Sequence, residues 1–349
     1  MAKDAQTIIV GDIGGTNVRL AFARLNQDSV TLESVWKQPG SRYATFRDAL
    51  DDFLAAHPEA EGGSRVKNAR GGGMKGGGAV GIALGLAGPV VGGRVEMLHS
   101  GWVVDAADIG AHLSTDAVLM VNDFVAMARS APELTDDQTQ TLSEGSPDPI
   151  GNIVVGGPGT GFGLGTLKQA RSGQQPAGWI VVGGEGGHQA FSPETDLEWR
   201  VAETLRADGV YVSNEVIASG SGFRETLDAL AKVLDLEVTT NDPAAIIELA
   251  AKGDALALAL CRLRARCTMS ALGDAALAAN ATGGVFIAGG VSPYLKPWLT
   301  EAEAIARFRK RGPRSPLLAD IPIRLVTGDK GALLGAAALW RDKQERGWI

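Results

Sequence analysis

A chain of 349 residues is longer than one ordinary domain, so two domains are the first expectation. Apolar residues make up 45% of the chain and charged residues 21%, a balance typical of globular proteins with sizeable cores. The net charge of −7 argues against nucleic acid as a main partner, because binding to a duplex requires a basic face.

Segments of strand and helix character alternate along the chain, which predicts an α/β fold. Strands are expected at residues 7–10, 18–23, 80–86, 117–121, 152–155, 163–167, 284–288 and 323–326. Helices are expected at residues 45–56, 124–131, 195–208, 222–234, 243–280 and 331–345. The long stretch 243–280 contains Gly253 and Gly273, so it is expected to form two helices or one kinked helix.

No targeting or membrane segment is expected. The opening MAKDAQTIIV lacks the apolar core of a signal peptide, and Gly and Pro break the most apolar stretches before they reach the ~18 residues of a membrane span. Cys261 and Cys267 are six residues apart in a helical stretch, a spacing that suits neither a disulfide nor a metal site. Both are expected to be reduced structural thiols in a cytoplasmic protein.

One internal repeat is visible. Residues 9–22 (IVGDIGGTNVRLAF) and 154–167 (VVGGPGTGFGLGTL) share an apolar strand, a Gly-rich turn and a second strand. They align at an offset of 145 residues, with Gly11 on Gly156 and Gly14 on Gly159. This pattern indicates a duplicated fold with two Gly-rich turns, although chance similarity between two turns would look the same.

The segment 61–78 (EGGSRVKNARGGGMKGGG) formally matches G-x-G-x-x-G but follows a polar basic run and precedes a strand. A dinucleotide fingerprint must follow a strand and open a helix, so this segment is interpreted as a flexible surface loop.

Three Gly-rich segments could hold an anion or a flat ring, because glycine lets backbone amides approach a ligand without a Cβ in the way. They are GDIGGTN (11–17), GPGTGFG (157–163) and the Gly pair that ends GGVFIAGGV (283–291). Each alone could be an ordinary turn. Asn122 and Asp123 end a predicted buried strand, where α/β sheets present ligand groups, although the pair could also cap the next helix.

Together, GDIGGTN, VND, GPGTGFG, GEGGHQAF, SNEVIASG and GGVFIAGGV resemble, in order, the motifs of the bacterial glucokinase family. The resemblance runs from Ile9 to about Leu339, apart from the Gly-rich insert. That family belongs to the superfamily of sugar kinases, actin and heat-shock-70 ATPases. The resemblance implies two ribonuclease-H-like (actin-like ATPase) α/β domains with a ligand cleft between them. The small domain would comprise 1–133 plus 329–349, and the large domain 134–328.

The resemblance also implies an activity and a set of site residues. The activity is transfer of the γ-phosphate of ATP to the 6-hydroxyl of glucose, with Mg²⁺, in a cytoplasmic homodimer that binds neither nucleic acid nor membrane. Asp123 would be the catalytic base, and the sugar would be held by Asn122, Glu185, His188 and Glu215. ATP would contact Gly11, Asp12, Gly14, Gly15, Thr16, Asn17, Gly159, Thr160, Gly161, Gly289 and Gly290, with Asp12 also near the metal.

The sequence departs from the family pattern at one sugar contact, where Leu98–His99 replaces a common Thr-Asn pair before Trp102. The nearest alternative is a related ROK kinase of fructose, mannose or an N-acetyl hexosamine. The Cys-rich zinc motif that many ROK kinases carry after the Gly-His segment does not follow His188 here. A sugar-sensing regulator would need a helix-turn-helix before the first strand. A filament-forming actin relative would have no reason to retain Glu185, His188 and Glu215.

Overall fold

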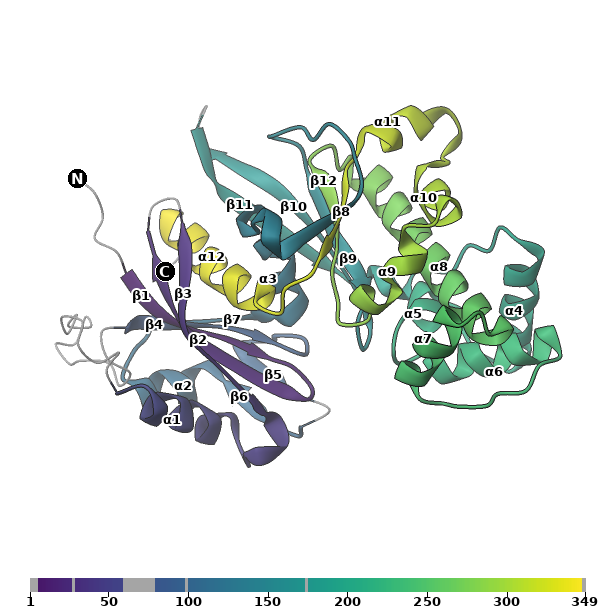
Figure 1. The fold of residues 1–349 in the computed structure, drawn as a ribbon. Helices are drawn as coiled ribbons and strands as arrows, with labels where there is room; N and C mark the ends of the chain where they lie inside the picture. Colours follow the sequence, from purple (N-terminus) through teal and green to yellow (C-terminus); the bar gives the residue numbers. More distant parts are fainter. Residues whose placement is uncertain (1–5, 27–28, 59–78, 98–99, 173–174, 347–349) are drawn as a thin grey trace. The chain divides into compact units, whose positions relative to one another are not determined.

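A computed structural model describes residues 6–26, 29–58, 79–97, 100–172 and 175–346 (Figure 1). The chain forms two compact units. The first comprises Met1–Thr135, Gln169–Val181 and Gly328–Ile349, and the second comprises Asp136–Lys168 and Val182–Thr327. The Gly-rich insert 61–78 and the Leu98–His99 pair lie outside the described residues.

The first unit is built on a five-stranded sheet in the order β3-β2-β1-β4-β7. Its strands are β1 (Gln6–Ile13), β2 (Asn17–Leu25), β3 (Val30–Pro39), β4 (Ala79–Leu86) and β7 (Val118–Asn122). β1 pairs antiparallel with β2 and parallel with β4, and β4 pairs parallel with β7. The carboxyl ends of β1, β4 and β7 therefore meet at one edge of the sheet.

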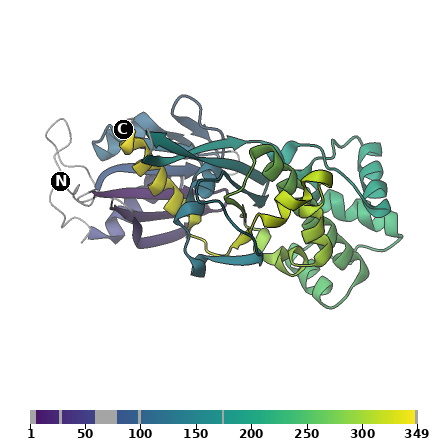
Figure 2. The same cartoon turned by 90° about the horizontal axis from the view of Figure 1, so that it is seen from above.

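Helices cover both faces of this sheet, which is why β1 has an almost continuous apolar run. Ile9 and Ile13 pack with α1 (Phe46–Ala56) and α2 (Ala106–Leu113) on one face. Ile8 and Val10 pack on the other face with α3 (Asp123–Ser130) and α12 (Gly331–Glu345). Both views of the ribbon show α12 lying across the strands (Figures 1 and 2).

α3 and α12 cross closely and share a buried ion pair. A Cβ on Gly335 of α12 would overlap the carbonyl oxygen of Ala126 in α3, so only glycine fits at the crossing. Arg129 of α3 donates from Nη2 to Oδ1 of Asp342 in α12 at 3.0 Å and from Nε to Oδ2. Each of these two residues is only 1% exposed. The helix that begins at Asp123 is thereby tied to the last helix of the unit.

A second sheet, built mainly from the second unit, repeats the topology of the first sheet. Its strand order is β11-β10-β9-β12-β13-β8, in which β9 pairs antiparallel with β10 and parallel with β12, and β12 pairs parallel with β13. The strands are β8 (Thr139–Ser143), β9 (Ile153–Pro158), β10 (Phe162–Ser172), β11 (Gln175–Gly184), β12 (Gly284–Ile287) and β13 (Ile323–Val326). Five strands thus match the first sheet one by one, which confirms the duplication predicted from the repeat; β8 is an added edge strand.

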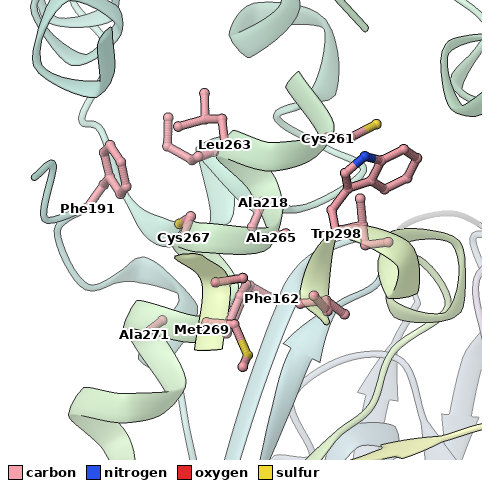
Figure 3. Close-up of a cluster of buried hydrophobic side chains, with 14 of the residues drawn as sticks. Phe162, Phe191, Ala218, Cys261, Leu263, Ala265, Cys267, Met269, Ala271 and Trp298 are labelled. Atoms are coloured by element: carbon pink, nitrogen blue, oxygen red, sulfur yellow. The ribbon is translucent and has the colours of Figure 1, made fainter. Parts of the chain in front are cut away.

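The helices of the second unit gather around the long helix α8. They are α4 (Asp196–Ala207), α5 (Asn214–Ala218), α6 (Phe223–Leu234), α7 (Pro243–Ala251), α8 (Ala255–Ala279), α9 (Ser292–Leu299), α10 (Ala302–Arg309) and α11 (Ser315–Asp320). Gly253, at φ +87°, separates α7 from α8, so the stretch 243–280 forms two helices. Cys261 and Cys267 lie buried among the apolar side chains of α8 (Figure 3) and are free thiols, as predicted.

The predicted domain boundaries differ from the observed units in the middle of the chain. The segment Gln169–Val181, which the predicted large domain included, belongs to the first unit. There Trp179 accepts a hydrogen bond from Arg346 through its carbonyl, and a Cβ on Gly178 would lie 2.5 Å from Oδ1 of Asp342. None of the helices in the described ranges is long and apolar enough to cross a membrane.

Candidate active site

Two carboxylates of the first unit lie close together at the edge where its parallel strands end. Asp12 lies near the end of β1, and Asp123 follows β7, which lies on the other side of β4. Asp12 pairs in register with Gly85 of β4, and a Cβ on Gly85 would lie 3.4 Å from the Cα of Asp123. Because Gly85 has no side chain, the start of α3, where Asp123 lies, can approach β4.

This environment changes the proton affinity of both acids. Burial, together with the nearby charge of Asp12, raises the pKa of Asp123 to about 6. The backbone amide of Phe124, which donates to Oδ1 of Asp123 at 2.8 Å, opposes that shift. Burial also raises the pKa of Asp12, although the guanidinium of Arg19 acts in the opposite direction. Asp123 is thus a carboxylate able to accept a proton near neutral pH.

Arg19 is a neighbour of Asp12 that no sequence motif singled out. The two residues face each other across the β1–β2 pair, and Nη1 of Arg19 donates to Oδ2 of Asp12 at 2.8 Å. The Nε of Arg19 is 3.8 Å from Asp329, which lies 3.9 Å from Nζ of Lys37. The Arg19–Asp12 pair could have been predicted from the sequence, because opposite charges at equal distances from a hairpin turn face each other across the strands.

The first Gly-rich turn joins β1 to β2. The amide of Gly14 donates to the carbonyl of Asn17 at 3.0 Å, and Gly15 and Thr16 are exposed. A Cβ on Gly14 would meet only the Asn17 carbonyl oxygen, at an ordinary 3.7 Å. Packing therefore does not require glycine at position 14, and the turn is accessible to a ligand.

Gly11, predicted with the same turn, has a different environment. It is a buried residue within β1, where a Cβ would lie 2.6 Å from the side chain of Leu84 and 2.7 Å from that of Ile13. Packing of the sheet alone accounts for glycine at this position.

Asn122 is the N-cap residue of α3. Its Oδ1 accepts hydrogen bonds from the amides of Phe124 at 2.9 Å and Val125 at 3.3 Å. Its Nδ2 donates to the carbonyl of Gly88 at 3.3 Å. Asn122 therefore caps α3, and its Nδ2 has a second hydrogen that could be donated to a further partner.

The second Gly-rich turn joins β9 to β10 and is supported by the loop after α5. Within the turn, the amide of Gly159 donates to the carbonyl of Gly161 at 2.8 Å. From the loop, the amide of Gly220 donates to the carbonyl of Gly159 at 2.9 Å, and that of Ser221 donates to Thr160 at 2.8 Å. These bonds hold the turn's carbonyls toward the loop.

The third Gly segment packs against this second turn. Gly289 has φ +103°, and a Cβ on it would lie 2.5 Å from the carbonyl oxygen of Pro158. A Cβ on Gly159 would lie 3.5 Å from the amide nitrogen of Gly290, whereas a Cβ on Gly290 would meet nothing within 4 Å. The second unit thus brings together two of the three predicted nucleotide segments.

The predicted sugar residues of the second unit also lie near this turn. His188 belongs to a short 3-10 turn (Gly186–His188), in which a Cβ on Gly187 would overlap the carbonyl oxygen of Phe162 at the start of β10. The amide of His188 donates to the carbonyl of Glu185 at 3.0 Å, and both side chains are exposed.

Glu215 links these residues to the second turn. Its Oε2 accepts a hydrogen bond from the amide of Phe162 at 2.8 Å, and its Oε1 is 3.9 Å from Nε2 of His188. A Cβ on Gly161 would lie 2.7 Å from Oε2, so this glycine makes room for the carboxylate. His188 and Glu215 therefore present an imidazole and a carboxylate side by side.

The described residues contain no cluster of three or more His, Cys, Asp or Glu side chains able to hold a metal ion. A metal at Asp12 would have to draw its other ligands from water and substrate. Mg²⁺ is commonly held in this way, by one or two carboxylates, waters and phosphate oxygens. One oxygen of Asp12 is bound to Arg19, which leaves the other for such a contact.

Comparison with known protein families gives one whole-chain match. A family model described as glucokinase matches residues 9–343. A glucokinase of Hahella chejuensis is 32% identical over 342 residues, which cover 97% of this chain and 98% of the relative. A glucokinase of Chromobacterium violaceum is 34% identical over 334 residues, covering 95% and 88% of the two chains.

Comparison with solved structures also gives glucokinases. The crystal structure of a glucokinase from an Antarctic psychrotroph has a TM-score of 0.82 and 31% identity, and the match covers 97% of this chain and 99% of that one. A ROK family glucokinase from Streptomyces griseus in complex with glucose and AMPPNP has a TM-score of 0.57 and 20% identity, covering 95% and 98%, and shares the fold. The predicted fold class, an α/β protein of the actin-like ATPase type, is confirmed by these matches.

Proposed function

Because the chain belongs to the glucokinase family, we propose that Asp123 is the general base of its reaction. Family membership makes the chain an ATP-dependent hexose kinase that converts glucose to glucose 6-phosphate. One observation carries the role of Asp123, namely that this carboxylate lies at the strand-end edge beside Asp12 with its pKa raised to about 6. Such a group is ionised at neutral pH and has a high enough pKa to accept a proton.

In the proposed reaction, the 6-oxygen of glucose forms a bond to the γ-phosphorus of ATP as the bond from that phosphorus to the ADP oxygen breaks. Asp123 accepts the hydroxyl proton, and ADP leaves with the bond's electrons. Phosphoryl transfer depends mostly on positioning and charge stabilisation, so the Gly-rich turns are expected to contribute more to catalysis than the general base does.

The nucleotide contacts are proposed for each unit separately. In the second unit, the accessible Gly290 and the turn of Gly159, Thr160 and Gly161 would hold adenosine and phosphates. In the first unit, the exposed turn of Gly14, Gly15 and Thr16, followed by Asn17, would contact the terminal phosphates. Backbone amides at such turns bind anions whatever the net charge of the protein.

Asp12 is the proposed protein ligand of Mg²⁺. The free oxygen of its carboxylate fits a site completed by waters and phosphate oxygens. The ion would neutralise phosphate charge, and Arg19 would keep the Asp12 carboxylate oriented.

Glu185, His188, Glu215 and Asn122 are the proposed sugar contacts, and Glu215 offers the sharpest test. We expect Glu215→Gln to weaken glucose binding by about 1–3 kcal/mol, roughly 5- to 150-fold. A glutamine oxygen can still accept from the Phe162 amide, but the amide group accepts fewer sugar hydroxyls than a carboxylate does. His188→Ala and Glu185→Gln should act in the same direction, with ADP affinity little changed.

The measurement is titration calorimetry with glucose and, separately, with ADP. Glu225→Gln, an exposed carboxylate in the first turn of α6, is the matched control and should bind glucose as the wild type does. Wild-type glucose affinity in Glu215→Gln, His188→Ala and Glu185→Gln alike would exclude these residues from the sugar site.

The raised pKa of Asp123 predicts the acid limb of the pH profile. We expect kcat/KM for glucose to fall about tenfold per pH unit below a midpoint near 6, because the base must be ionised in the free enzyme. Asp12→Asn should move the midpoint to lower pH, because the charge of Asp12 contributes to the raised pKa. Circular dichroism at each pH separates titration from unfolding, and a flat profile down to pH 5 would contradict the assignment.

The substrate is tested with a coupled assay of ATP against a panel of hexoses. Glucose is expected to give the highest kcat/KM. The alternative, a ROK-like kinase of fructose, mannose or an N-acetyl hexosamine, would be favoured if one of those sugars exceeded glucose. A homodimeric state and a cytoplasmic location are proposed from the family resemblance, and light scattering after size exclusion tests the first.

A further inference from the structure

Three arginines are buried in the described part of the chain, and one of them lacks a carboxylate partner there. Arg129 pairs with Asp342 and Glu133, and Arg307 pairs with Glu194 and Glu198. Arg264, on α8, is 4% exposed and makes no ion pair with any Asp or Glu among the described residues. A buried charge without a counterion is costly, so this exception calls for a physical reason.

The contacts of Arg264 are polar but not anionic. Its Nε and Nη2 both donate to the carbonyl oxygen of Ala218, at 3.1 and 2.8 Å, and its guanidinium lies over the Phe223 ring, 5.5 Å from the centroid. Cys261 and Cys267 are also near, but burial raises the pKa of both thiols, to about 12 for Cys261, so both are neutral at physiological pH. Burial lowers the pKa of Arg264 only to about 10, so its positive charge remains.

The carbonyl that Arg264 holds lies at the base of the second Gly-rich turn. Ala218 is the last residue of α5, beside α8 (Figure 3), and the chain continues directly into the loop that supports the turn. Two residues later, Gly220 donates to the carbonyl of Gly159, and Ser221 donates to Thr160. The guanidinium is therefore anchored two Cα steps, at most about 7–8 Å of chain, from the residue that bonds the turn.

We propose that Arg264 is a positioning residue for the nucleotide phosphates. Its two hydrogen bonds fix the loop under the second turn, and its uncompensated charge is balanced by the anion bound at that turn. The proposal rests on the assignment of Gly159, Thr160 and Gly161 to phosphate binding.

The size of the effect follows from Coulomb's law. At a separation of about 10 Å and an effective dielectric constant of about 20, one unit charge changes the affinity for a unit anion on the order of tenfold. A neutral ligand at the same place gains nothing from this charge. Arg264 should therefore affect binding of ADP and not of adenosine.

The experiment compares ADP and adenosine affinities, by calorimetry, in a pair of variants. Arg264→Gln keeps a donor for the Ala218 carbonyl but removes the charge, and should bind ADP about tenfold more weakly with adenosine affinity unchanged. Arg264→Lys keeps the charge and one donor, and should restore ADP affinity to within about threefold of wild type. If the glutamine variant does not fold, Arg264→Met, a second neutral variant without a buried amide, replaces it in the comparison.

The matched control is Arg262→Gln. Arg262 lies two residues earlier on α8, is 43% exposed and pairs with Glu301, so its loss removes the same charge from the same helix at the surface. Its ADP affinity should equal that of the wild type. Unchanged ADP affinity in the neutral Arg264 variants, or an equal loss for ADP and adenosine in all of them, would overturn the proposal.

The Thr160→Val variant tests the phosphate assignment of the second turn separately from the role of Arg264. If the turn binds phosphate, loss of the Thr160 hydroxyl weakens ADP binding whatever Arg264 does. If Thr160→Val weakens ADP binding and Arg264→Gln does not, the role of Arg264 is refuted and the phosphate assignment of the turn stands. Insensitivity to both would refute the phosphate assignment of the turn.

Discussion

The Asp123→Asn substitution is expected to lower turnover about 10²- to 10⁴-fold while the protein still folds and binds glucose. An asparagine oxygen can accept the Phe124 amide as the carboxylate does, so the start of α3 should be unchanged. The raised pKa of Asp123 means that the folded state destabilises the ionised carboxylate. This cost appears as pH rises from about 4 to 6, so a neutral amide should not lower stability at pH 7.

The measurement is kcat at saturating glucose and ATP, together with glucose affinity by calorimetry. Asp108→Asn is the matched control, because Asp108 is an exposed carboxylate in the first turn of α2 in the same unit. It should keep turnover within about twofold of wild type. Turnover of Asp123→Asn within a few-fold of wild type would show that another group accepts the proton.

The largest effect on stability is expected for Asp342→Asn. It leaves the buried Arg129 guanidinium without the carboxylate that accepts two of its hydrogen bonds, and breaking such a pair costs about 3–5 kcal/mol. Glu133 still accepts from Nη1 of Arg129 at 3.0 Å, which should keep the loss toward the lower end. Thermal and denaturant unfolding, followed by a probe in the first unit, measure the change.

Asp228→Asn is the control for this substitution. Asp228 pairs with Arg224 on the surface of α6, where both side chains are about half exposed, and should contribute at most about 0.5 kcal/mol. The double variant Arg129→Met with Asp342→Leu should recover much of the lost stability, because no buried charge is then left unpaired. Equal melting temperatures for Asp342→Asn and Asp228→Asn would contradict this account of the pair.

The sequence predicted the parts of the fold that have a strong local pattern. β1 and β4 are nearly continuous apolar runs, and the two Gly-rich hairpins repeat each other, so local sequence is enough to predict these strands and the duplication. Strands β3 and β8 were missed because they carry many polar residues and lie at sheet edges. The edge strand β11 was missed because it contains three glycines and a proline, which are typical of turns rather than strands. The short helices α2, α5, α9, α10 and α11 were missed because 5–8 residues hold too little periodicity.

For the candidate site, the motifs named several residues that the structure brings close together within each unit, but they did not predict what each residue contacts. The proximity of Asp12 and Asp123 depends on a parallel crossover through β4, and that of His188 and Glu215 on two segments meeting at Phe162. Such contacts join residues far apart in sequence, so local pattern does not contain them. Gly11 shows the converse, because a motif glycine there is required by packing against Leu84.

The division of the first unit among distant parts of the chain has a consequence for synthesis. Its sheet and α3 emerge early from the ribosome, but α12, which buries one face of that sheet, is translated only after the entire second unit. At about 5–20 residues per second, that face would stay uncovered for tens of seconds. The second unit, although encoded later, is the first that can complete its core. Nascent chains of this protein should therefore be most vulnerable to aggregation and proteolysis in their N-terminal part.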